Sequence, residues 1–287
     1  MEAKGPYNAM DHTRLDPIQE NPMQPRSPFY REAGSGPGVV CAHANASTSG
    51  QWRSLMARLS PGFHVLAPDS YGSGKSPEWP SDRVIALADE VDLLEPVLAR
   101  AGEQVVLVGH SYGAAVALIA ALADPGRVRA LALYEPTLFS LLDAEQAPPN
   151  DADGIRHTVA RATAALEAGD RDTAAREFID YWMGAGSWDR TPEQGKPAIA
   201  ASMVNVGRWA HALTTEPTPL AAFAALDMPV LYMVGKRSPA SALGVARLLR
   251  TILPKVELIE FDDLGHMGPL THPDQVNETI AQFLERL

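Results

Sequence analysis

The sequence has a single cysteine and few cationic residues. Because Cys41 has no second cysteine to pair with, an intramolecular disulfide is impossible, and a zinc site built from several cysteines is excluded. The 24 Lys and Arg residues stand against 35 Asp and Glu, which gives a net charge of −11 with His neutral. Nucleic-acid binding without sequence preference needs clustered cations, and so does a basic membrane-binding patch. The charge balance therefore argues against both classes of partner.

Long apolar stretches are missing as well. The segments 105–108 and 114–123 are apolar, but the residues between them include Gly, His and Ser. Neither approaches the roughly 18–20 apolar residues of a membrane-spanning helix. The first 16 residues contain no apolar segment typical of a secretory signal. We therefore expect a cytoplasmic protein that does not enter a membrane.

Hydrophobic residues make up 46% of the 287-residue chain and charged residues 21%, the composition of a globular protein with a sizeable core. Residues 1–27 are rich in proline and show little periodicity, so we expect an extended or disordered arm. From residue 28, apolar runs typical of buried strands alternate with helical patterns. The strands are expected at 38–44, 64–70, 104–111 and 128–136, and the helices at 49–59, 82–101 and 112–123. This alternation predicts an α/β fold with a mostly parallel sheet flanked by helices.

The alternation stops after residue 136. Residues 137–226 show helical patterns at 155–168, 173–182 and 199–213 and no convincing strand. Strands resume at 228–235 and 255–261, with helices at 241–253 and from residue 273. A helical block set between two strands of one sheet indicates an inserted cap. We therefore expect a first core part at 28–136, a helical cap at 137–226 and a second core part at 227–287.

The clearest chemical motif is Gly109-His110-Ser111-Tyr112-Gly113, which fits G-x-S-x-G between an apolar strand and an Ala-rich helix. In that context the turn is so tight that side chains larger than Gly would clash at the flanking positions. The turn also raises the serine hydroxyl above the sheet, at the positive end of the next helix. We therefore predict Ser111 to be a nucleophile. Its base is predicted to be His266, which follows the last strand, where open α/β sheets place their chemistry.

Further segments extend this pattern along the chain: His43-Ala44-Asn45, Pro68-Asp69, Gly72-x-Gly74-x-Ser76, Leu133-Tyr134-Glu135-Pro136 and Gly265-His266. With them, the chain resembles the α/β-hydrolase family from about Pro28 to Leu287. The resemblance implies that family's fold, with a cap over the nucleophile. It also implies an oxyanion hole formed by the backbone N–H groups of Tyr112 and Asn45. Ala44 stands where the family usually has glycine, and the Asn45 side chain either donates as well or caps the loop.

The acid that orients the histidine is less simple to assign. The resemblance places it after strand 228–235 in a Gly-x-x-Asp pattern, but this chain has Gly235-Lys236-Arg237-Ser238. A serine does not stabilise an imidazolium as a carboxylate does. Glu135, at the end of the preceding strand, is the preferred acid, because some family members place it there. It would otherwise cap a helix, and Asp262 or Asp263, or a Ser–His dyad without an acid, are the alternatives.

These residues predict a serine hydrolase that cleaves a small to medium carboxylic ester or related acyl compound through an acyl-enzyme on Ser111. The expected partner is a small-molecule substrate, with no organic cofactor and no metal. A cofactor-free perhydrolase or haloperoxidase, a carbon–carbon bond hydrolase on the same triad, and a non-hydrolysing small-molecule binder are the alternatives. The oligomeric state is not predicted. Several cap side chains either line the pocket or pack against the sheet: Trp182, Met183, Trp188, Met203, Trp209 and His211.

Overall fold

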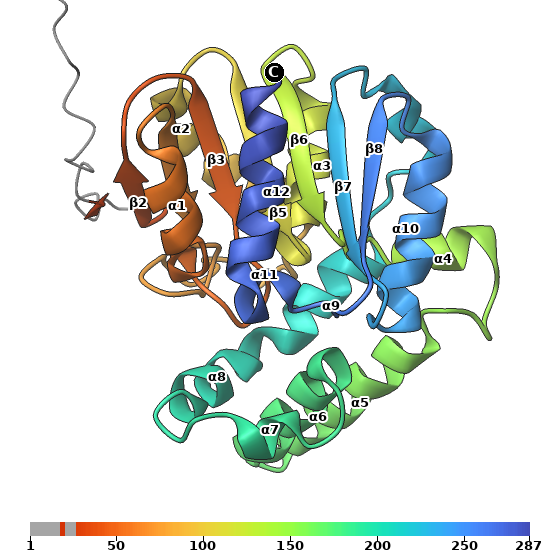
Figure 1. The fold of residues 1–287 in the computed structure, drawn as a ribbon. Helices are drawn as coiled ribbons and strands as arrows, with labels where there is room; N and C mark the ends of the chain where they lie inside the picture. The colour runs from red at the N-terminus through yellow and green to blue at the C-terminus, as the bar shows by residue number, and fades with distance from the viewer. Residues whose placement is uncertain (1–17, 21–26) are drawn as a thin grey trace, which may run out of the picture.

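The computed structural model describes residues 18–20 and 27–287, and an eight-stranded sheet runs through this part of the chain (Figure 1). The strand order is β1-β2-β4-β3-β5-β6-β7-β8. All pairs from β4 to β8 are parallel, while β1 and β2 add an antiparallel edge. The bounds are β1 Gln19–Glu20, β2 Tyr30–Ala33, β3 Gly38–Ala42, β4 His64–Pro68, β5 Val105–His110, β6 Val128–Tyr134, β7 Val230–Gly235 and β8 Val256–Phe261. The predicted mostly parallel sheet is confirmed.

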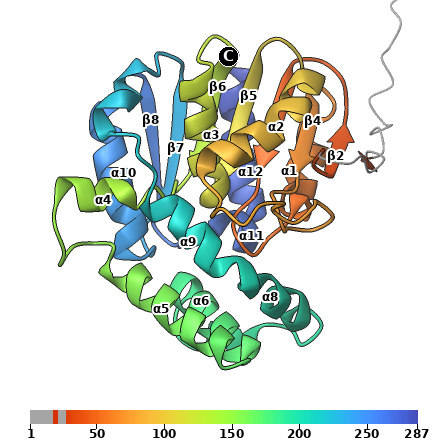
Figure 2. The ribbon, with the colours of Figure 1, turned by 180° about the vertical axis from the view of Figure 1, so that it is seen from behind.

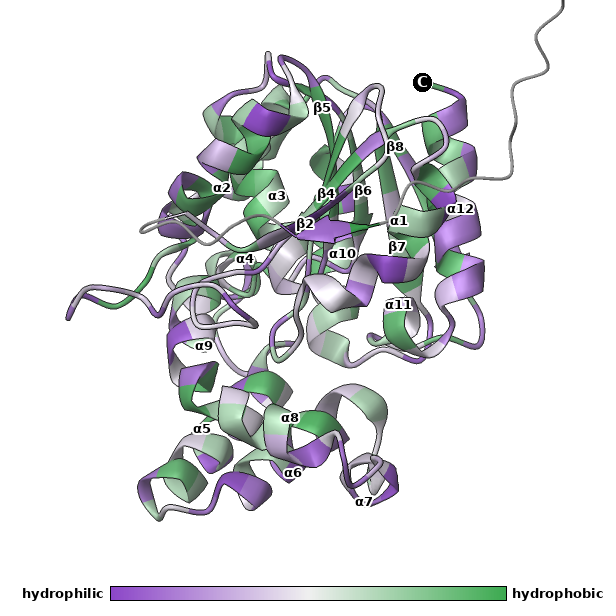
Figure 3. Ribbon diagram, turned by 90° about the vertical axis from the view of Figure 1, so that its left-hand side faces the viewer, coloured by the Kyte–Doolittle hydropathy of each residue, from purple (hydrophilic) through white to green (hydrophobic). Residues whose placement is uncertain are grey.

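Helices cover both faces of the sheet and enclose an apolar core on each side. Helices α1 (Arg53–Leu59) and α12 (Pro273–Glu285) lie on one face (Figure 1). Helices α2 (Leu87–Ala101), α3 (Tyr112–Ala123) and α10 (Ala240–Ile252) lie on the other (Figure 2). Every residue of β5 is buried, and the hydrophobic strands run between the helical layers in Figure 3. Strands buried on both faces explain why the sequence shows continuous apolar runs instead of alternation.

The chain between β6 and β7 is helical and contains no strand. Its elements are α4 (Ser140–Glu145), α5 (Asp153–Glu167), α6 (Arg171–Met183), α7 (Ser187–Arg190), α8 (Lys196–Ser202), α9 (Val206–Thr214) and the 3₁₀ turns η2 (Met203–Asn205) and η3 (Leu220–Ala225). We call α5 to α9 the helical cap. It lies across the end of the sheet where β5 and β6 end (Figures 1 and 3). The exact division of the chain into core and cap stays a prediction.

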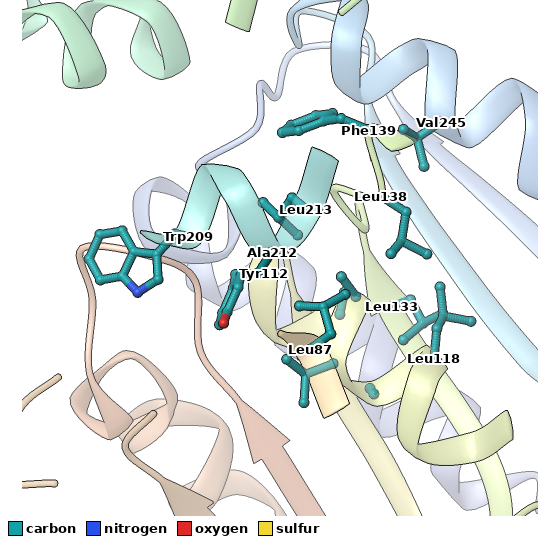
Figure 4. Close-up of a cluster of buried hydrophobic side chains, with 14 of the residues drawn as sticks. Leu87, Tyr112, Leu118, Leu133, Leu138, Phe139, Trp209, Ala212, Leu213 and Val245 are labelled. Atoms are coloured by element: carbon teal, nitrogen blue, oxygen red, sulfur yellow. The ribbon is translucent and has the colours of Figure 1, made fainter. Parts of the chain in front are cut away.

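Helix α9 connects the cap to the core. Its side chains Trp209, Ala212 and Leu213 are buried, as is Tyr112 at the start of α3. Figure 4 shows this group together with Leu138, which follows β6. Because these apolar side chains form one cluster, the cap packs directly over the carboxyl ends of the central strands.

Some element bounds differ from the sequence prediction. Helix α2 begins at Leu87 instead of residue 82, because Ala86 is extended (φ −109°, ψ 164°) and its N–H donates to the Asp89 carboxylate over 2.8 Å. The predicted helix 199–213 is interrupted by η2, where the Asn205 side chain donates to the carbonyl of Gly72. The interruption of the expected continuous helix thus coincides with a polar contact between the cap and the core.

Other differences concern the first residues. Strand β2 was not predicted, and Gln19–Glu20, which falls in the predicted arm, pairs with it as β1. Residues 1–17 and 21–26 of that arm lie outside the described residues. Among the helices of the described residues, none combines the length and the hydropathy needed to cross a bilayer.

Candidate active site

The turn after β5 holds Ser111 in a backbone conformation that is rare for a non-glycine residue. Ser111 has φ 57° and ψ −117° and stands directly before α3. A Cβ atom on Gly109 would lie 2.5 Å from the Cα of Ala114, and one on Gly113 would lie 2.4 Å from the carbonyl oxygen of Ala42. The predicted steric need for both glycines is confirmed. Strain of this kind is found at active sites, where it aims a side chain into a pocket.

Three side chains from different strand ends form a continuous hydrogen-bonded chain. The Nε2 atom of His266 lies 2.9 Å from Oγ of Ser111, and its Nδ1 atom lies 2.6 Å from Oε2 of Glu135. All three residues are at most 5% exposed. A carboxylate oxygen accepts a hydrogen bond, so Nδ1 carries the proton and Nε2 is able to accept the proton of the serine hydroxyl. This is the geometry in which a hydroxyl is activated and the resulting imidazolium is stabilised.

The Glu135 carboxylate is held on its other oxygen. Oε1 accepts hydrogen bonds from the Gly235 N–H over 2.7 Å and from the Ser238 hydroxyl over 2.6 Å. Glu135 also has a left-handed backbone (φ 46°), a second strained residue at the end of a central strand. Ser238 stands at the position where the family resemblance places the acid. Its hydroxyl instead donates to the carboxylate of Glu135, at the end of the neighbouring strand. Two fixed donors leave Oε2 to face His266.

The alternative acids do not reach the histidine. The Asp262 side chain is 79% exposed and pairs with Lys236, which lowers the pKa of that carboxyl. The Asp263 side chain is 80% exposed and pairs with Arg237. Their closeness to His266 in sequence does not bring them to its ring. Both carboxylates therefore belong to surface ion pairs.

The backbone N–H groups of Tyr112 and Asn45, the predicted oxyanion donors, have no partner among the described residues that would compete with a substrate. Neither the Tyr112 N–H nor the Asn45 N–H donates a hydrogen bond within the described part of the chain, and Asn45 lines the same cavity as Ser111. Ala44 has an ordinary negative φ, and the left-handed residue of the loop is Ala46 (φ 56°). The alanine at position 44 therefore adds no backbone strain to this loop.

A partly buried polar relay, missed by the sequence analysis, connects this loop to the histidine loop. The Ala44 N–H donates to Oε1 of Gln51, whose Nε2 lies 3.1 Å from Nδ1 of His110. Nε2 of His110 lies 2.8 Å from the carbonyl oxygen of His266 and donates to it. Burial lowers the pKa of His110 well below its ordinary value, so the ring stays neutral and both donates and accepts. Sequence separations of 59 and 156 residues left no local signal for these contacts.

A second buried polar contact joins the Tyr112 side chain to Glu90. Glu90 of α2 is 2% exposed and accepts hydrogen bonds from the Tyr71 N–H and the Tyr112 hydroxyl, over 3.3 and 3.2 Å. Burial raises the pKa of Glu90 to about 8 and that of Tyr112 well above its ordinary value. At neutral pH both groups are therefore uncharged, and the turn that holds Ser111 is followed by a neutral polar contact.

A small cavity of about 30 Å³ lies beside Ser111 and His266, with room for roughly two to three water-sized groups. Its lining is mostly apolar and includes no Lys or Arg: Ala44, Asn45, Ser111, Thr137, Phe139, Ile155, Val159, Phe178, Trp182, Val206, Trp209, Ala210, Leu213, His266 and Met267. A larger groove of about 330 Å³, called the outer groove below, shares Asn45, Phe178, Trp182 and Met267 with the cavity. Most of the cavity wall thus comes from the cap.

The cap side chains whose role the sequence left open divide into several groups. Trp182 and Trp209 line the cavity. Met183 does not line the cavity but does line the outer groove. Trp188 and Met203 are buried in the cap core. His211 lines neither space and instead borders a separate pocket between α5 and α9.

Trp182 also contacts the histidine itself. Its ring centroid lies 3.9 Å from that of the His266 imidazole, with 28° between the planes. Tyr181 packs edge-on against the indole (4.8 Å, 80°). An aromatic face over an imidazole attracts the ring when it becomes positively charged. The cap therefore places an aromatic face directly against the His266 ring.

Other predicted features have local structural explanations. Cys41 is fully buried in β3, and burial raises the pKa of its thiol. His43 donates through Nδ1 to the Ala44 carbonyl (2.7 Å) and accepts the Ser70 N–H at Nε2 (3.0 Å). Among the described residues, no group of three or more His, Cys, Asp or Glu side chains is arranged to hold a metal ion.

Comparison with known proteins gives consistent matches over most of the chain. A family model described as alpha/beta hydrolase fold matches residues 37–273. The 2-(acetamidomethylene)succinate hydrolase of Mesorhizobium japonicum is 31% identical over 89% of this chain and 90% of its own length. The pimeloyl-[acyl-carrier protein] methyl ester esterase of Chromobacterium violaceum is 27% identical over 90% of this chain and 98% of its own. The crystal structure of an alpha/beta hydrolase from Sphaerobacter thermophilus matches with a TM-score of 0.69 and 26% identity, covering 89% of this chain and 95% of that one.

Proposed function

Because the chain belongs to the alpha/beta hydrolase fold family, we propose that it is a serine hydrolase that cleaves a carboxylic ester through an acyl-enzyme on Ser111. The observation that carries the proposal is the buried hydrogen-bonded chain from Ser111 through His266 to Glu135. A serine hydroxyl with an aligned base and a buried carboxylate behind that base is the arrangement that acyl transfer requires. The similarity to a methyl ester esterase supports an ester as the substrate.

In the proposed first half-reaction, Oγ of Ser111 attacks the ester carbonyl carbon while Nε2 of His266 takes the hydroxyl proton. The N–H groups of Tyr112 and Asn45 stabilise the oxyanion, each contributing about 3 kcal/mol to the transition state. Glu135 keeps the proton on Nδ1 and stabilises the imidazolium. The tetrahedral intermediate then breaks its bond to the alcohol oxygen, which leaves with the proton from His266.

In the second half-reaction a water molecule replaces the alcohol. His266 takes one proton from that water, and the hydroxide oxygen attacks the acyl carbon of the ester on Ser111. Collapse of the second intermediate returns the proton through His266 to Oγ of Ser111 and releases the carboxylic acid. The reaction consumes one ester and one water and needs no cofactor.

The cavity favours a neutral, compact group next to the reacting carbonyl. No Lys or Arg lines it, so a carboxylate placed there would lose its hydration without gaining a cationic partner. The outer groove has Arg190 as its single Lys or Arg and is otherwise lined mainly by apolar side chains. We therefore expect a small-molecule ester with a short apolar part in the cavity and a longer part in the groove.

The test is covalent labelling of the intact protein with a fluorophosphonate, followed by peptide mass spectrometry. We expect one label on Ser111, none on the Ser111→Ala variant, and loss of p-nitrophenyl butanoate hydrolysis in that variant. A folded protein that stays unlabelled would overturn the proposed function, and so would labelling that persists in Ser111→Ala.

A further inference from the structure

We propose that Thr137 is a substrate-binding residue whose hydroxyl donates a hydrogen bond to an acceptor atom in the substrate. The substrate class that follows is an ester bearing an ether, hydroxyl, keto or amide oxygen close to the scissile carbonyl. This inference rests on the proposed ester hydrolase function and adds a specificity residue to it.

The Thr137 hydroxyl is buried and has no hydrogen-bond partner. The residue is 1% exposed, and Oγ1 is among the few buried side-chain atoms of the described residues that lack a partner. Within this part of the protein the hydroxyl is therefore a donor without an acceptor, whereas a valine of nearly the same shape would leave no polar group unpaired.

The residue that carries this hydroxyl lies beside the reacting groups. Of the residues with such atoms, Arg31, Ser49, Trp52, Thr137, Ser140 and Tyr232, only Thr137 lines the cavity beside Ser111 and His266. At a cavity, a polar group that no part of the protein pairs with is available to a bound molecule. The partner of this hydroxyl is therefore expected to be the substrate.

The geometry also favours a strong and selective hydrogen bond. Thr137 follows Glu135 by two residues, and its carbonyl accepts the Phe139 N–H over 2.9 Å, which holds the backbone in place. A β-branched side chain has few rotamers, so the hydroxyl has a restricted direction. The mostly apolar lining strengthens any hydrogen bond made inside the cavity and penalises a substrate that leaves the hydroxyl unpaired.

The experiment compares substrates that differ only by exchange of CH₂ for O. On the acyl side these are p-nitrophenyl pentanoate, p-nitrophenyl ethoxyacetate and p-nitrophenyl 3-methoxypropanoate. On the alcohol side they are butyl ethanoate and 2-methoxyethyl ethanoate. For each pair, the ratio of kcat/KM for the oxygen-bearing ester to kcat/KM for its hydrocarbon partner is measured. Intrinsic reactivity cancels when these ratios are compared between wild type and variants.

In Thr137→Val we expect the ratio to fall about fivefold to tenfold for at least one oxygen position, the size of one neutral hydrogen bond. Thr137→Ser keeps a hydroxyl and is expected to keep the wild-type ratio within about twofold. Ser140→Ala is the matched control, because Ser140 has a similar unpartnered hydroxyl on the same segment and does not line the cavity. Its ratios are expected to equal those of the wild type.

Ratios in Thr137→Val that stay within twofold of wild type for every pair would overturn the inference. A fluorophosphonate-labelled protein that hydrolyses none of these esters would overturn it too, since the substrate class would be wrong. Absence of labelling on Ser111 is a different result, because it removes the proposed function itself. If Thr137→Val does not fold, Thr137→Ala provides the same comparison without the hydroxyl.

Discussion

Replacing Glu135 by Gln keeps the shape of the side chain and exchanges one carboxylate oxygen for an amide NH₂. The structure determines which oxygen is exchanged. Oε1 accepts hydrogen bonds from the Gly235 N–H and the Ser238 hydroxyl, over 2.7 and 2.6 Å. Only the amide oxygen is able to accept both, so the amide nitrogen must take the position of Oε2, opposite His266.

This orientation forces the histidine into the wrong tautomer. An amide N–H facing Nδ1 of His266 requires that nitrogen to accept, so the proton of the neutral imidazole moves to Nε2. Nε2 lies 2.9 Å from Oγ of Ser111 and is then no longer able to accept the serine proton. Trapping a triad histidine in this tautomer lowers turnover about 10⁴-fold, which corresponds to about 5 kcal/mol of transition-state stabilisation.

The assay is kcat on a p-nitrophenyl ester, normalised to the fraction of folded protein by thermal unfolding. Asp262→Asn and Asp263→Asn are matched controls, because each makes the same chemical change in an exposed carboxylate a few residues from His266. Both are expected to stay within about twofold of wild type. A Glu135→Gln variant that retains more than a tenth of wild-type kcat would refute the reasoning, as would an equal loss in Asp263→Asn.

Three further predictions concern the groups around this chain. Ser238→Ala removes a hydrogen bond to a buried carboxylate, so kcat is expected to fall about 10-fold to 100-fold with little change in KM, and Ser238→Thr to restore it; an unchanged kcat contradicts this. Trp182→Leu removes the ring stacked on His266, and kcat is expected to fall about fivefold while Trp182→Phe keeps most of it; equal losses in both variants would exclude a role for the aromatic face. Glu90→Gln is expected to alter the pH dependence of stability. Burial raises the pKa of Glu90 from 4.5 to about 8, so the folded protein keeps a proton that the unfolded chain releases above pH 4.5. The free energy of unfolding therefore falls with rising pH, reaching a loss of about 5 kcal/mol above pH 8. In urea denaturation the stability of the Gln variant relative to wild type should grow by about 1.4 kcal/mol per pH unit from pH 5 to 8; a difference that does not change with pH refutes this.

Much of the core fold was predictable because its signals are local. A strand buried on both faces must be apolar along its length, so runs such as those of β5 and β6 are visible without any knowledge of their neighbours. The bounds of the elements were less predictable, since they depend on contacts across the fold. The break at η2, for example, coincides with a hydrogen bond from Asn205 to a loop more than a hundred residues away.

The turn that holds the predicted nucleophile was also readable from the chain alone. The turn around Ser111 is specified by steric contacts of Gly109 and Gly113 with backbone that the neighbouring strands and helix supply. The predicted base, His266, was identified from its place after the last strand. For the acid, the family resemblance favoured Glu135, but Asp262 and Asp263 also follow a strand, so the sequence left all three open.

By itself, therefore, the sequence determined the strand–helix alternation, the elbow serine and the short list of possible acids, since each depends on residues close together in the chain. The tertiary structure alone decided that Glu135 faces His266, that Ser238 holds that carboxylate, and that Thr137 lines the cavity without a partner. Strand order is the physical reason. β6, β7 and β8 lie side by side, so their ends meet at one edge of the sheet. Which side chains then touch depends on burial and on competing ion pairs, which no spacing along the chain records.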